Sequence, residues 1–300
     1  MSLPSSFLAF ALRNESWASW LAALPKLIRT VLGEWTLTVD GPARSGQAAV
    51  ALPVLTADRE PAMLKLGWPH PEAEHEHLAL RAWGGVGAVR LLQADPRRSV
   101  LLLERAQADR DLNTLPVVEA CEEVASLYGQ LHRPAIPQLR RLDELAAAWA
   151  DQLDGLRADR RVPPRYLEQA AGLARDFAVD PASSGTLLHT DLHYDNVLAS
   201  ARQPWLAIDP KPVSGDPAFE VAPLLWNRWE EAVASGNIRN ALLDRMYAVV
   251  DAAGLDEDRV RAWITVRELV NVMWSLSDGP GPGQGDWLTT AITIVKAVQR

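Results

Sequence analysis

The densest group of reactive side chains lies in residues 189–196, which read His-Thr-Asp-Leu-His-Tyr-Asp-Asn. Asn196 follows Asp191 by five residues, and Asp209 comes thirteen residues after Asn196, at the end of an apolar run. Phosphoryl transfer needs a carboxylate to orient the attacking hydroxyl and oxygen ligands to hold Mg²⁺ against the phosphates. Asp191 can supply the carboxylate, and Asn196 and Asp209 can bind the metal because hard cations prefer oxygen ligands.

The same segment allows two other interpretations. His189, Asp191, His193 and Asp195 alternate along the chain and could bind a transition metal, as in a metal-dependent hydrolase. Alternatively, the Asp and Asn side chains could simply form the turns of a polar surface loop. The hydrolase alternative gives no role to Lys65.

Lys65 interrupts the apolar stretch 61–67 and is one of only four lysines among 30 basic residues. A lysine kept inside such a strand is expected of a side chain that binds α- and β-phosphates, although it could also reach solvent from the strand edge. An acid on the next helix would hold it in place. Glu72, Glu74 and Glu76 are all available.

The spacing of apolar residues predicts a change of structure along the chain. Helical spacing over 6–32 predicts one or two opening helices, followed by strands at 35–39, 48–55, 62–66, 88–92 and 99–103 and a helix at 70–83. Helices are expected at 117–132, 142–156 and 165–177, with four more between 218 and 299. An insert at 186–209 contains two short strands around the polar segment. The chain therefore reads as a sheet-rich part followed by a helical part.

At these residues a family resemblance appears. The pattern His-x-Asp, four residues, Asn resembles the catalytic loop of protein-kinase-like phosphotransferases. Residues 205–211 (Trp-Leu-Ala-Ile-Asp-Pro-Lys) and 215–220 (Gly-Asp-Pro-Ala-Phe-Glu) resemble the streptomycin 6-kinase and hydroxyurea-kinase branch of the aminoglycoside phosphotransferases. Two departures are Thr190, where a small or basic residue is more usual, and Pro210-Lys211, where protein kinases have Phe-Gly. The second is typical of the resembled branch and argues against protein substrates.

The resemblance implies an α+β, two-lobed protein-kinase-like fold. Residues 1–104 would form the nucleotide-binding lobe, a small antiparallel sheet with one internal helix after the opening helices. Residues 105–300 would form a mainly helical lobe with the catalytic loop and the acceptor site. The implied activity is transfer of the γ-phosphoryl group of ATP (or GTP), with Mg²⁺, to a small-molecule hydroxyl. An aminoglycoside such as streptomycin is the leading acceptor, and hydroxyurea or another small metabolite is the alternative.

The resemblance also assigns roles to individual residues. Asp191 would be the catalytic base, Asn196 and Asp209 the magnesium ligands, and His189 a structural anchor of the loop. In the nucleotide-binding lobe, aligning residues 76–80 with the family's helix favours Glu76 as the partner of Lys65. The backbone of Glu104 and Ala106 would contact adenine.

A streptomycin-like acceptor carries strongly basic guanidinium groups, which carboxylates bind through charge-assisted hydrogen bonds. Asp195, Asp216 and Glu220 are the expected acceptor-binding residues, and the C-terminal part adds Glu268, Asp278 and Asp286 as candidates. Those that follow Asp209 could instead cap helices or lie on the surface.

Composition limits the remaining possibilities. With 300 residues, 48% of them hydrophobic, the chain can bury a sizeable core, and its net charge of −8 lacks the basic footprint of nucleic-acid binding. Cys121 is the single cysteine, and neither a signal peptide nor a long apolar run is apparent. We therefore expect a cytoplasmic protein with no nucleic-acid, membrane or implied protein partner. Residues 279–283 (Gly-Pro-Gly-Pro-Gly) are expected to form a loop.

Overall fold

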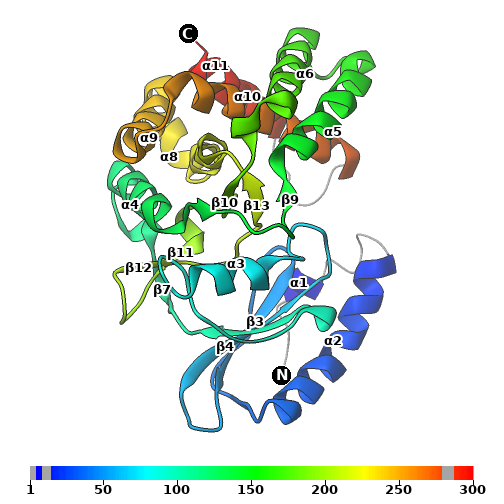
Figure 1. Ribbon diagram of the computed structural model, residues 1–300, viewed down its shortest axis with the longest axis vertical. Helices are drawn as coiled ribbons and strands as arrows, with labels where there is room; N and C mark the ends of the chain where they lie inside the picture. Colours follow the sequence, from blue (N-terminus) through cyan, green and yellow to red (C-terminus); the bar gives the residue numbers. More distant parts are fainter. Residues whose placement is uncertain (1–4, 9–14, 279–286, 300) are drawn as a thin grey trace. The chain divides into compact units, whose positions relative to one another are not determined.

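The computed structural model describes residues 5–8, 15–278 and 287–299 (Figure 1). The chain divides into two compact units, one made of Met1–Gln107 with Ser200–Leu206, the other of Ala108–Ala199 with Ala207–Arg300. The expected loop at 279–283 and the candidate acid Asp286 lie outside the described residues. None of the helices in the described ranges is long and apolar enough to cross a membrane.

The first unit is a small antiparallel sheet with helices. Its elements are α1 (Ser5–Leu8), α2 (Glu15–Glu34), β1 (Thr38–Val39), β2 (Arg44–Ser45), β3 (Ala49–Leu55), β4 (Pro61–Gly67), α3 (Glu76–Trp83), β5 (Leu91–Asp95) and β6 (Val100–Glu104). The strand order is β1-β3-β4-β6-β5, and β2 pairs with β3. The sequence therefore predicted the strands of this sheet within a few residues, apart from the short β2.

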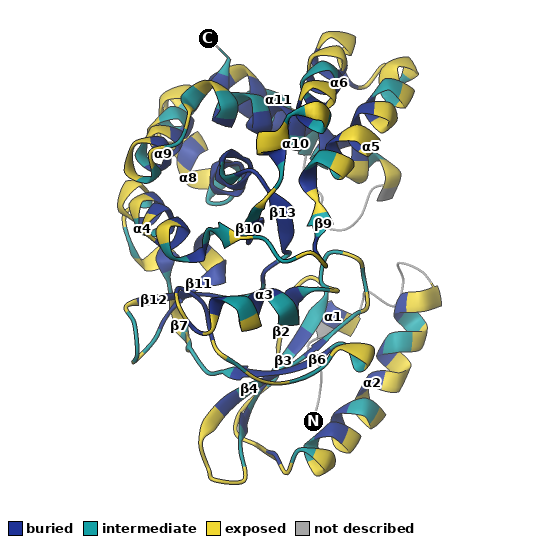
Figure 2. Ribbon diagram, in the orientation of Figure 1, coloured by how far each residue is buried: buried dark blue, intermediate teal, exposed yellow. Residues whose placement is uncertain are grey.

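The two faces of this sheet differ because side chains alternate along a strand. Every second residue of β3 and β4, such as Leu52 and Leu64, is fully buried in a core shared with α2 (Figure 2). Leu24 and Val31 of α2 belong to the same core. Lys65 comes between Leu64 and Leu66, so its side chain leaves the opposite face.

The helix expected over 70–83 begins only at Glu76, with His75 as its N-cap residue. Prolines 69 and 71 explain the late start, because proline lacks an N–H donor and disfavours helical backbone in the residue before it. The helix ends at Gly84, whose φ of 59° suits the left-handed C-cap that glycine adopts without strain. The shortened α3 carries Glu76 in its first turn.

Residues 200–206 join the first unit through Arg202. Its guanidinium donates Nε to Glu104 Oε1 at 3.0 Å and Nη2 to Glu104 Oε2 at 2.9 Å. The same side chain also donates to the carbonyl oxygens of Gly85, at 2.5 Å, and Ala88, at 3.2 Å. The proposed division at residue 104 did not anticipate this return of the chain, because the bonds join residues about a hundred positions apart.

The second unit is mainly helical. Its longer helices are α4 (Val117–Leu131), α5 (Leu142–Gly155), α6 (Pro164–Val179), α9 (Ile238–Ala253), α10 (Glu257–Asp278) and α11 (Trp287–Val298), with short α7 (Pro223–Trp226) and α8 (Trp229–Ala234). Its strands are β7 (Gln107–Asp111), β8 (Arg133–Pro134), β9 (Arg140–Arg141), β10 (Thr186–Leu188), β11 (Val197–Ala199) and β13 (Val213–Gly215), while β12 (Trp205–Ala207) spans the unit boundary. The α+β fold class is confirmed.

A small sheet in this unit places the polar segment. Strand order is β8-β10-β13-β9, with β10 and β13 antiparallel and Leu188 opposite Val213. The loop that follows β10 holds residues 189–193 and then one turn of 3₁₀ helix, η6 (Tyr194–Asn196). A second 3₁₀ helix, η7 (Pro217–Val221), follows β13. The polar segment therefore follows β10, which together with β13 forms the nearly buried middle of the sheet.

Candidate active site

In the first unit, Lys65 of β4 forms an ion pair with Glu76 of α3. Lys65 Nζ lies 2.6 Å from both carboxylate oxygens of Glu76, and the two side chains are 12% and 5% exposed. Lys65 stands opposite Ala51 on β3 and Leu101 on β6, which gives it small or apolar neighbours across the sheet. Of the three acids available, Glu76 is the one that holds the lysine.

Glu104 and Ala106 lie at the end of the same sheet. Glu104 is the last residue of β6, and Ala106 is half-buried two residues later. Burial by itself raises the pKa of Glu104, but hydrogen bonds from Arg202 and the Arg90 amide outweigh it and hold the pKa below its usual value. The Glu104 side chain is thus engaged within the unit.

In the second unit, His189 fixes the start of the polar loop, which comprises residues 189–196. Its side chain is fully buried, with Nε2 2.9 Å from the carbonyl oxygen of Ile208 and Nδ1 3.3 Å from the amide of Asp191. Burial lowers the pKa of His189, which favours the neutral ring. A neutral imidazole can donate through Nε2 and accept through Nδ1, so His189 joins the loop to the Ile208 backbone.

Thr190 adopts a left-handed backbone with φ of 62°, which is unfavourable for a β-branched residue. Three bonds hold it there. Its amide donates to Glu220 Oε1 at 2.6 Å, its hydroxyl donates to the Lys211 carbonyl at 2.6 Å, and its carbonyl accepts from Arg267 Nη2 at 2.7 Å. A local backbone strain is therefore offset by groups from distant parts of the chain.

Asp191, Asn196 and Asp209 come together in this unit. Asn196 Nδ2 donates to the Asp191 carbonyl at 2.8 Å, and the Ile208 amide donates to the Asn196 carbonyl at 2.9 Å, one residue before Asp209. Because its amide nitrogen is bound, Asn196 keeps Oδ1 for another ligand. An amide oxygen and the partly exposed Asp209 carboxylate are a donor set that suits Mg²⁺.

Lys211 connects the two carboxylates of this group. Its Nζ lies 3.0 Å from Asp209 Oδ1 and 3.9 Å from Asp191 Oδ2. The ammonium group thus reduces the repulsion between two acids that must lie close together. Sequence reasoning assigned no role to Lys211, although the scarcity of lysine in the chain was a usable signal.

Asp216 does not serve as the expected acceptor-binding residue. Its side chain is buried and caps η7 by accepting from the Ala218 amide at 3.0 Å. Asp216 also accepts from Trp263 Nε1 at 2.6 Å and forms a short ion pair with Arg259. These internal partners occupy the carboxylate, which corrects the earlier expectation.

Glu220 needs the same correction. It is fully buried, and its carboxylate accepts from the Thr190 amide and lies 2.7 Å from His132 Nε2. Burial alone raises the pKa of Glu220, but the hydrogen bonds from His132 and Thr190 lower it further than burial raises it. Glu220 therefore stays ionised as a support of the loop and is not placed to contact a soluble acceptor.

The remaining acids differ in exposure. Asp195 is 61% exposed and accepts from Asn113 Nδ2 at 2.7 Å, and its contact with His193 lowers its pKa. Glu268 is fully buried in α10, and neither of its carboxylate oxygens has a hydrogen-bond partner among the described residues. Burial raises the pKa of Glu268 well above its usual value. Asp278 ends α10, and its side chain is outside the described part.

The alternating histidines and aspartates do not gather as a transition-metal site. Among the described residues no three His, Cys, Asp or Glu side chains converge in a metal-binding arrangement. His189 is directed to the Ile208 carbonyl, while Asp195 lies near His193 Nδ1 at 3.4 Å. The geometry therefore gives the hydrolase alternative no support.

Comparison with known proteins decides the family. Residues 34–279 match the aminoglycoside/hydroxyurea antibiotic resistance kinase family. The chain belongs to this family. The kinase is 40% identical to streptomycin 6-kinase of Streptomyces glaucescens over 272 residues, covering 89% of this chain and 87% of the relative. It is 39% identical to hydroxyurea phosphotransferase of Kitasatospora aureofaciens over 288 residues, covering 93% and 82%.

Solved structures support the fold of the kinase. One is a thermostable mutant of aminoglycoside phosphotransferase APH(4)-Ia in a ternary complex with AMP-PNP and hygromycin B. It matches with a TM-score of 0.62 at 19% identity and covers 90% of this chain and 97% of its own. A choline/ethanolamine kinase family protein from Mesorhizobium loti matches with a TM-score of 0.55 at 17% identity, covering 95% and 93%. These structures establish the kinase-like fold, while the family match and the relatives of about 40% identity establish an enzyme that phosphorylates a hydroxyl.

Proposed function

We propose that the kinase transfers the γ-phosphoryl group of ATP, or of GTP, to a hydroxyl of a cationic aminoglycoside of the streptomycin type, with Mg²⁺. The observation that carries this proposal is the grouping of Asp191 and Asn196, on the polar loop, with Asp209, in a chain 40% identical to streptomycin 6-kinases. Hydroxyurea is the competing acceptor, since its phosphotransferase is 39% identical.

In this proposal Asp191 orients the acceptor hydroxyl and accepts its proton as the new P–O bond forms. Its partly exposed carboxylate is held by the anchored backbone on either side, so little reorganisation is required. Asn196 Oδ1 and Asp209 would hold Mg²⁺, which neutralises charge on the phosphates. Lys211 keeps the carboxylates of Asp191 and Asp209 from repelling each other.

In the first unit, Lys65 would bind the α- and β-phosphates, with Glu76 setting its position. The small and apolar side chains beside Lys65 on β3 and β6 leave a face suited to a purine ring. The backbone of Glu104 and Ala106 remains our proposed contact for the purine edge.

Of the three expected acceptor-binding carboxylates, Asp195, Asp216 and Glu220, only Asp195 is exposed. Asp195 is the exposed acid on the polar loop, and we propose that it binds a cationic group of the acceptor. An exposed ion pair is screened by salt, so the acceptor KM should rise with ionic strength while the nucleotide KM changes less.

A panel assay tests the proposed function. Nucleotide consumption is measured with streptomycin, other aminoglycosides, hydroxyurea and simple sugars, and the phosphorylated product is identified by mass spectrometry. Streptomycin-dependent consumption is expected, with none in the Asp191→Asn protein. Turnover with hydroxyurea alone would replace the acceptor and leave the phosphotransferase assignment intact.

A further inference from the structure

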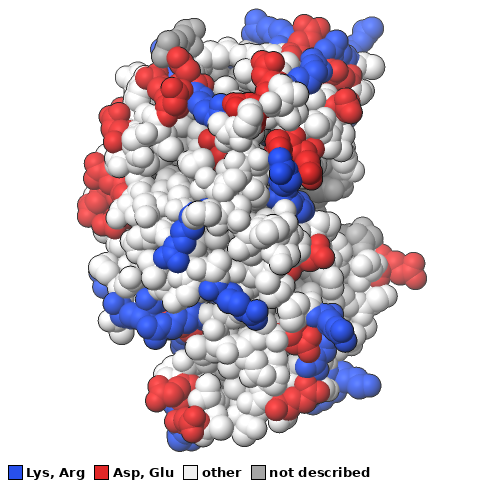
Figure 3. All heavy atoms as spheres, in the orientation of Figure 1, with Lys and Arg blue, Asp and Glu red and all other residues white. Residues whose placement is uncertain are grey.

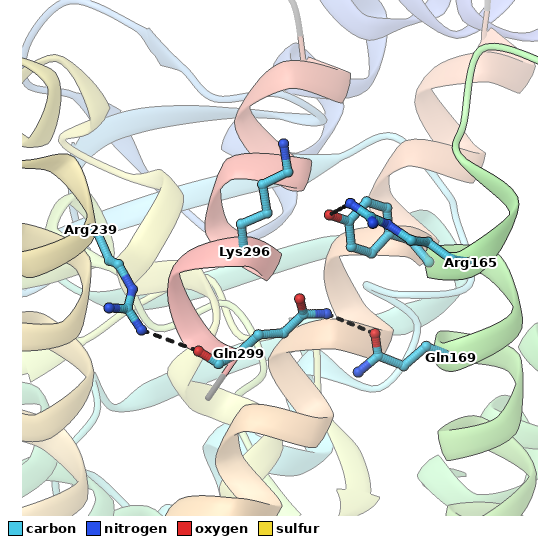
Figure 4. Close-up of a pocket in the computed structure, with 6 residues that line it drawn as sticks. Arg165, Gln169, Arg239, Lys296 and Gln299 are labelled. Atoms are coloured by element: carbon cyan, nitrogen blue, oxygen red, sulfur yellow. Dashed lines mark hydrogen bonds between the residues drawn. The ribbon is translucent and has the colours of Figure 1, made fainter.

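A surface pocket of about 600 Å³ lies among the helices of the second unit, and it shares no residue with the polar loop. It is lined by Arg165, Tyr166 and Gln169 of α6, Arg239 of α9, Lys296 of α11 and the adjoining Gln299. Figure 4 shows Arg239 and Arg165 on opposite sides, with Lys296 and Gln299 between them. A pocket of this volume can hold a small molecule.

The charge of the pocket departs from that of the rest of the chain. Three of its six lining residues are cationic and none is acidic, in a chain whose net charge is −8. Among the described residues, Arg165, Arg239 and Lys296 form no ion pair with a carboxylate, whereas Arg175 and Arg157 both pair with Asp154. On the molecular face in Figure 3, positive and negative side chains are interspersed. All three cationic side chains are exposed, and an anion bound in the pocket could form charge-assisted hydrogen bonds with them.

The ends of two helices strengthen the case. Arg165 and Arg239 are each the second residue of a helix of 16 residues, and neither helix has an acid in its first turn. The N-terminal end of a helix carries partial positive charge and normally favours Asp or Glu. Both arginines are thus placed where a cation is disfavoured, and both line the same pocket. An anion in the pocket would compensate both positions at once.

Neutral partners hold these side chains and leave them charged. The Arg165 guanidinium lies 4.6 Å from the Tyr166 ring centre and donates Nη2 to the Tyr166 hydroxyl at 2.8 Å. Arg239 Nη2 donates to the Gln299 carbonyl at 3.3 Å, and Gln299 Nε2 donates to Gln169 Oε1 at 2.8 Å (Figure 4). Each guanidinium keeps further N–H donors for a ligand.

We propose that this pocket is a second anion-binding site of the kinase, for a small ligand with at least two negative charges such as a diphosphate. Arg165 and Arg239 would bind the anion from two sides, and Lys296 would contact it from α11. This site goes beyond the proposed phosphotransfer and does not depend on the identity of the acceptor.

Titration with inorganic pyrophosphate tests the proposal, using the full chain, an ionic strength of about 0.1 M and EDTA, with isothermal calorimetry as the readout. The Lys65→Gln protein serves as the parent, because Lys65 is the other place where a phosphate is expected to bind. One pyrophosphate should bind each chain. The Arg165→Gln/Arg239→Gln protein should bind pyrophosphate at least about tenfold more weakly, since charge-assisted contacts are lost from both sides.

The matched control is Arg157→Gln/Arg175→Gln, which removes two exposed arginines from outside the pocket. Its pyrophosphate affinity should stay within about twofold of the parent, because distant exposed charges are largely screened. Lys296→Gln should weaken pyrophosphate binding about threefold. This single variant replaces the double variant in the test if the double variant does not fold. Undetectable binding to the parent at millimolar pyrophosphate would overturn the site, as would equal affinities in all of these proteins.

Discussion

Lys65 and Asp191 are positioned in different ways. Lys65 takes its place from a regular strand and a regular helix, and one ion pair with Glu76 orients it. Asp191 lies on irregular backbone directly after the left-handed Thr190, which is held by bonds from several distant elements.

This difference shows what irregular backbone requires. A strand or helix satisfies its own polar groups through a repeating pattern, whereas a loop at a buried position must find other partners. Here the partners include Glu220, a carboxylate with no exposed surface, and Arg267. We therefore expect the polar loop to be the more costly region to disturb, in stability as well as in activity.

The largest effect is expected at the reacting group itself. Asp191→Asn should lower kcat about 10²–10⁴-fold, because the carboxylate that orients the hydroxyl and takes its proton is lost. Nucleotide affinity should change little, since Lys65 is untouched. Steady-state kinetics and nucleotide titration measure both quantities, and near-normal turnover by the folded variant would remove Asp191 from the mechanism.

Glu220→Ala should be the next largest change. It leaves the Thr190 amide and His132 Nε2 without their buried acceptor, and each buried hydrogen-bonding group left unsatisfied costs about 1–3 kcal/mol. Urea unfolding measures the loss, and kcat should fall with it because Thr190 no longer holds its position. A variant as stable as the wild type would show that the loop does not depend on this carboxylate.

The buried acids should respond to pH in opposite directions. Glu268 remains protonated in the fold while the unfolded chain ionises above about pH 4.5, so raising the pH through this window destabilises the protein by about 1.4 kcal/mol per unit until the folded pKa is reached. Glu268→Gln should match wild type at pH 4 and become the more stable protein as the pH rises, by a margin that grows until the folded pKa of Glu268 is reached.

Glu220 provides the contrast to Glu268. Its pKa is lowered in the fold, so its contribution is present above the unfolded pKa and is lost as pH falls through the folded pKa. Glu220→Gln should therefore lose least, relative to wild type, at acidic pH. Denaturant unfolding from about pH 3 to pH 8 gives both profiles. A difference for Glu268→Gln that stays constant with pH would mean that this acid is ionised in the fold.

The smallest effect on stability is expected at the Lys65–Glu76 ion pair, whose residues lie on a regular strand and a regular helix. Glu76→Ala should cost less than Glu220→Ala, because it leaves one ammonium group without this partner while the backbone of β4 and α3 keeps its own regular hydrogen bonds. The nucleotide KM should nevertheless rise, since the lysine loses its orientation. If Glu76→Ala destabilises the protein as much as Glu220→Ala, the proposed difference between the two regions is wrong.

The sequence was sufficient where a repeating pattern or a short motif carries the information. Short apolar runs bounded by turn residues predicted β3, β4 and β6, and also that Lys65 interrupts one of these strands. The spacing from Asp191 to Asn196 and Asp209 predicted which loop carries the polar group, and the resemblance it supported led to the correct family. Such information is local in the chain, so it can be read without knowing how the elements pack.

Tertiary structure alone decided the roles of the supporting charges. In the sequence, Asp216, Glu220 and Glu268 are equally plausible surface acids, yet all three are buried and each has different surroundings. Arg259 and Trp263 bind Asp216, His132 and Thr190 bind Glu220, and no described group donates to Glu268. The two partners of Glu220, Thr190 and His132, lie 30 and 88 positions away in the chain. The charge, exposure and function of a carboxylate depend on such long-range neighbours, which no local pattern specifies.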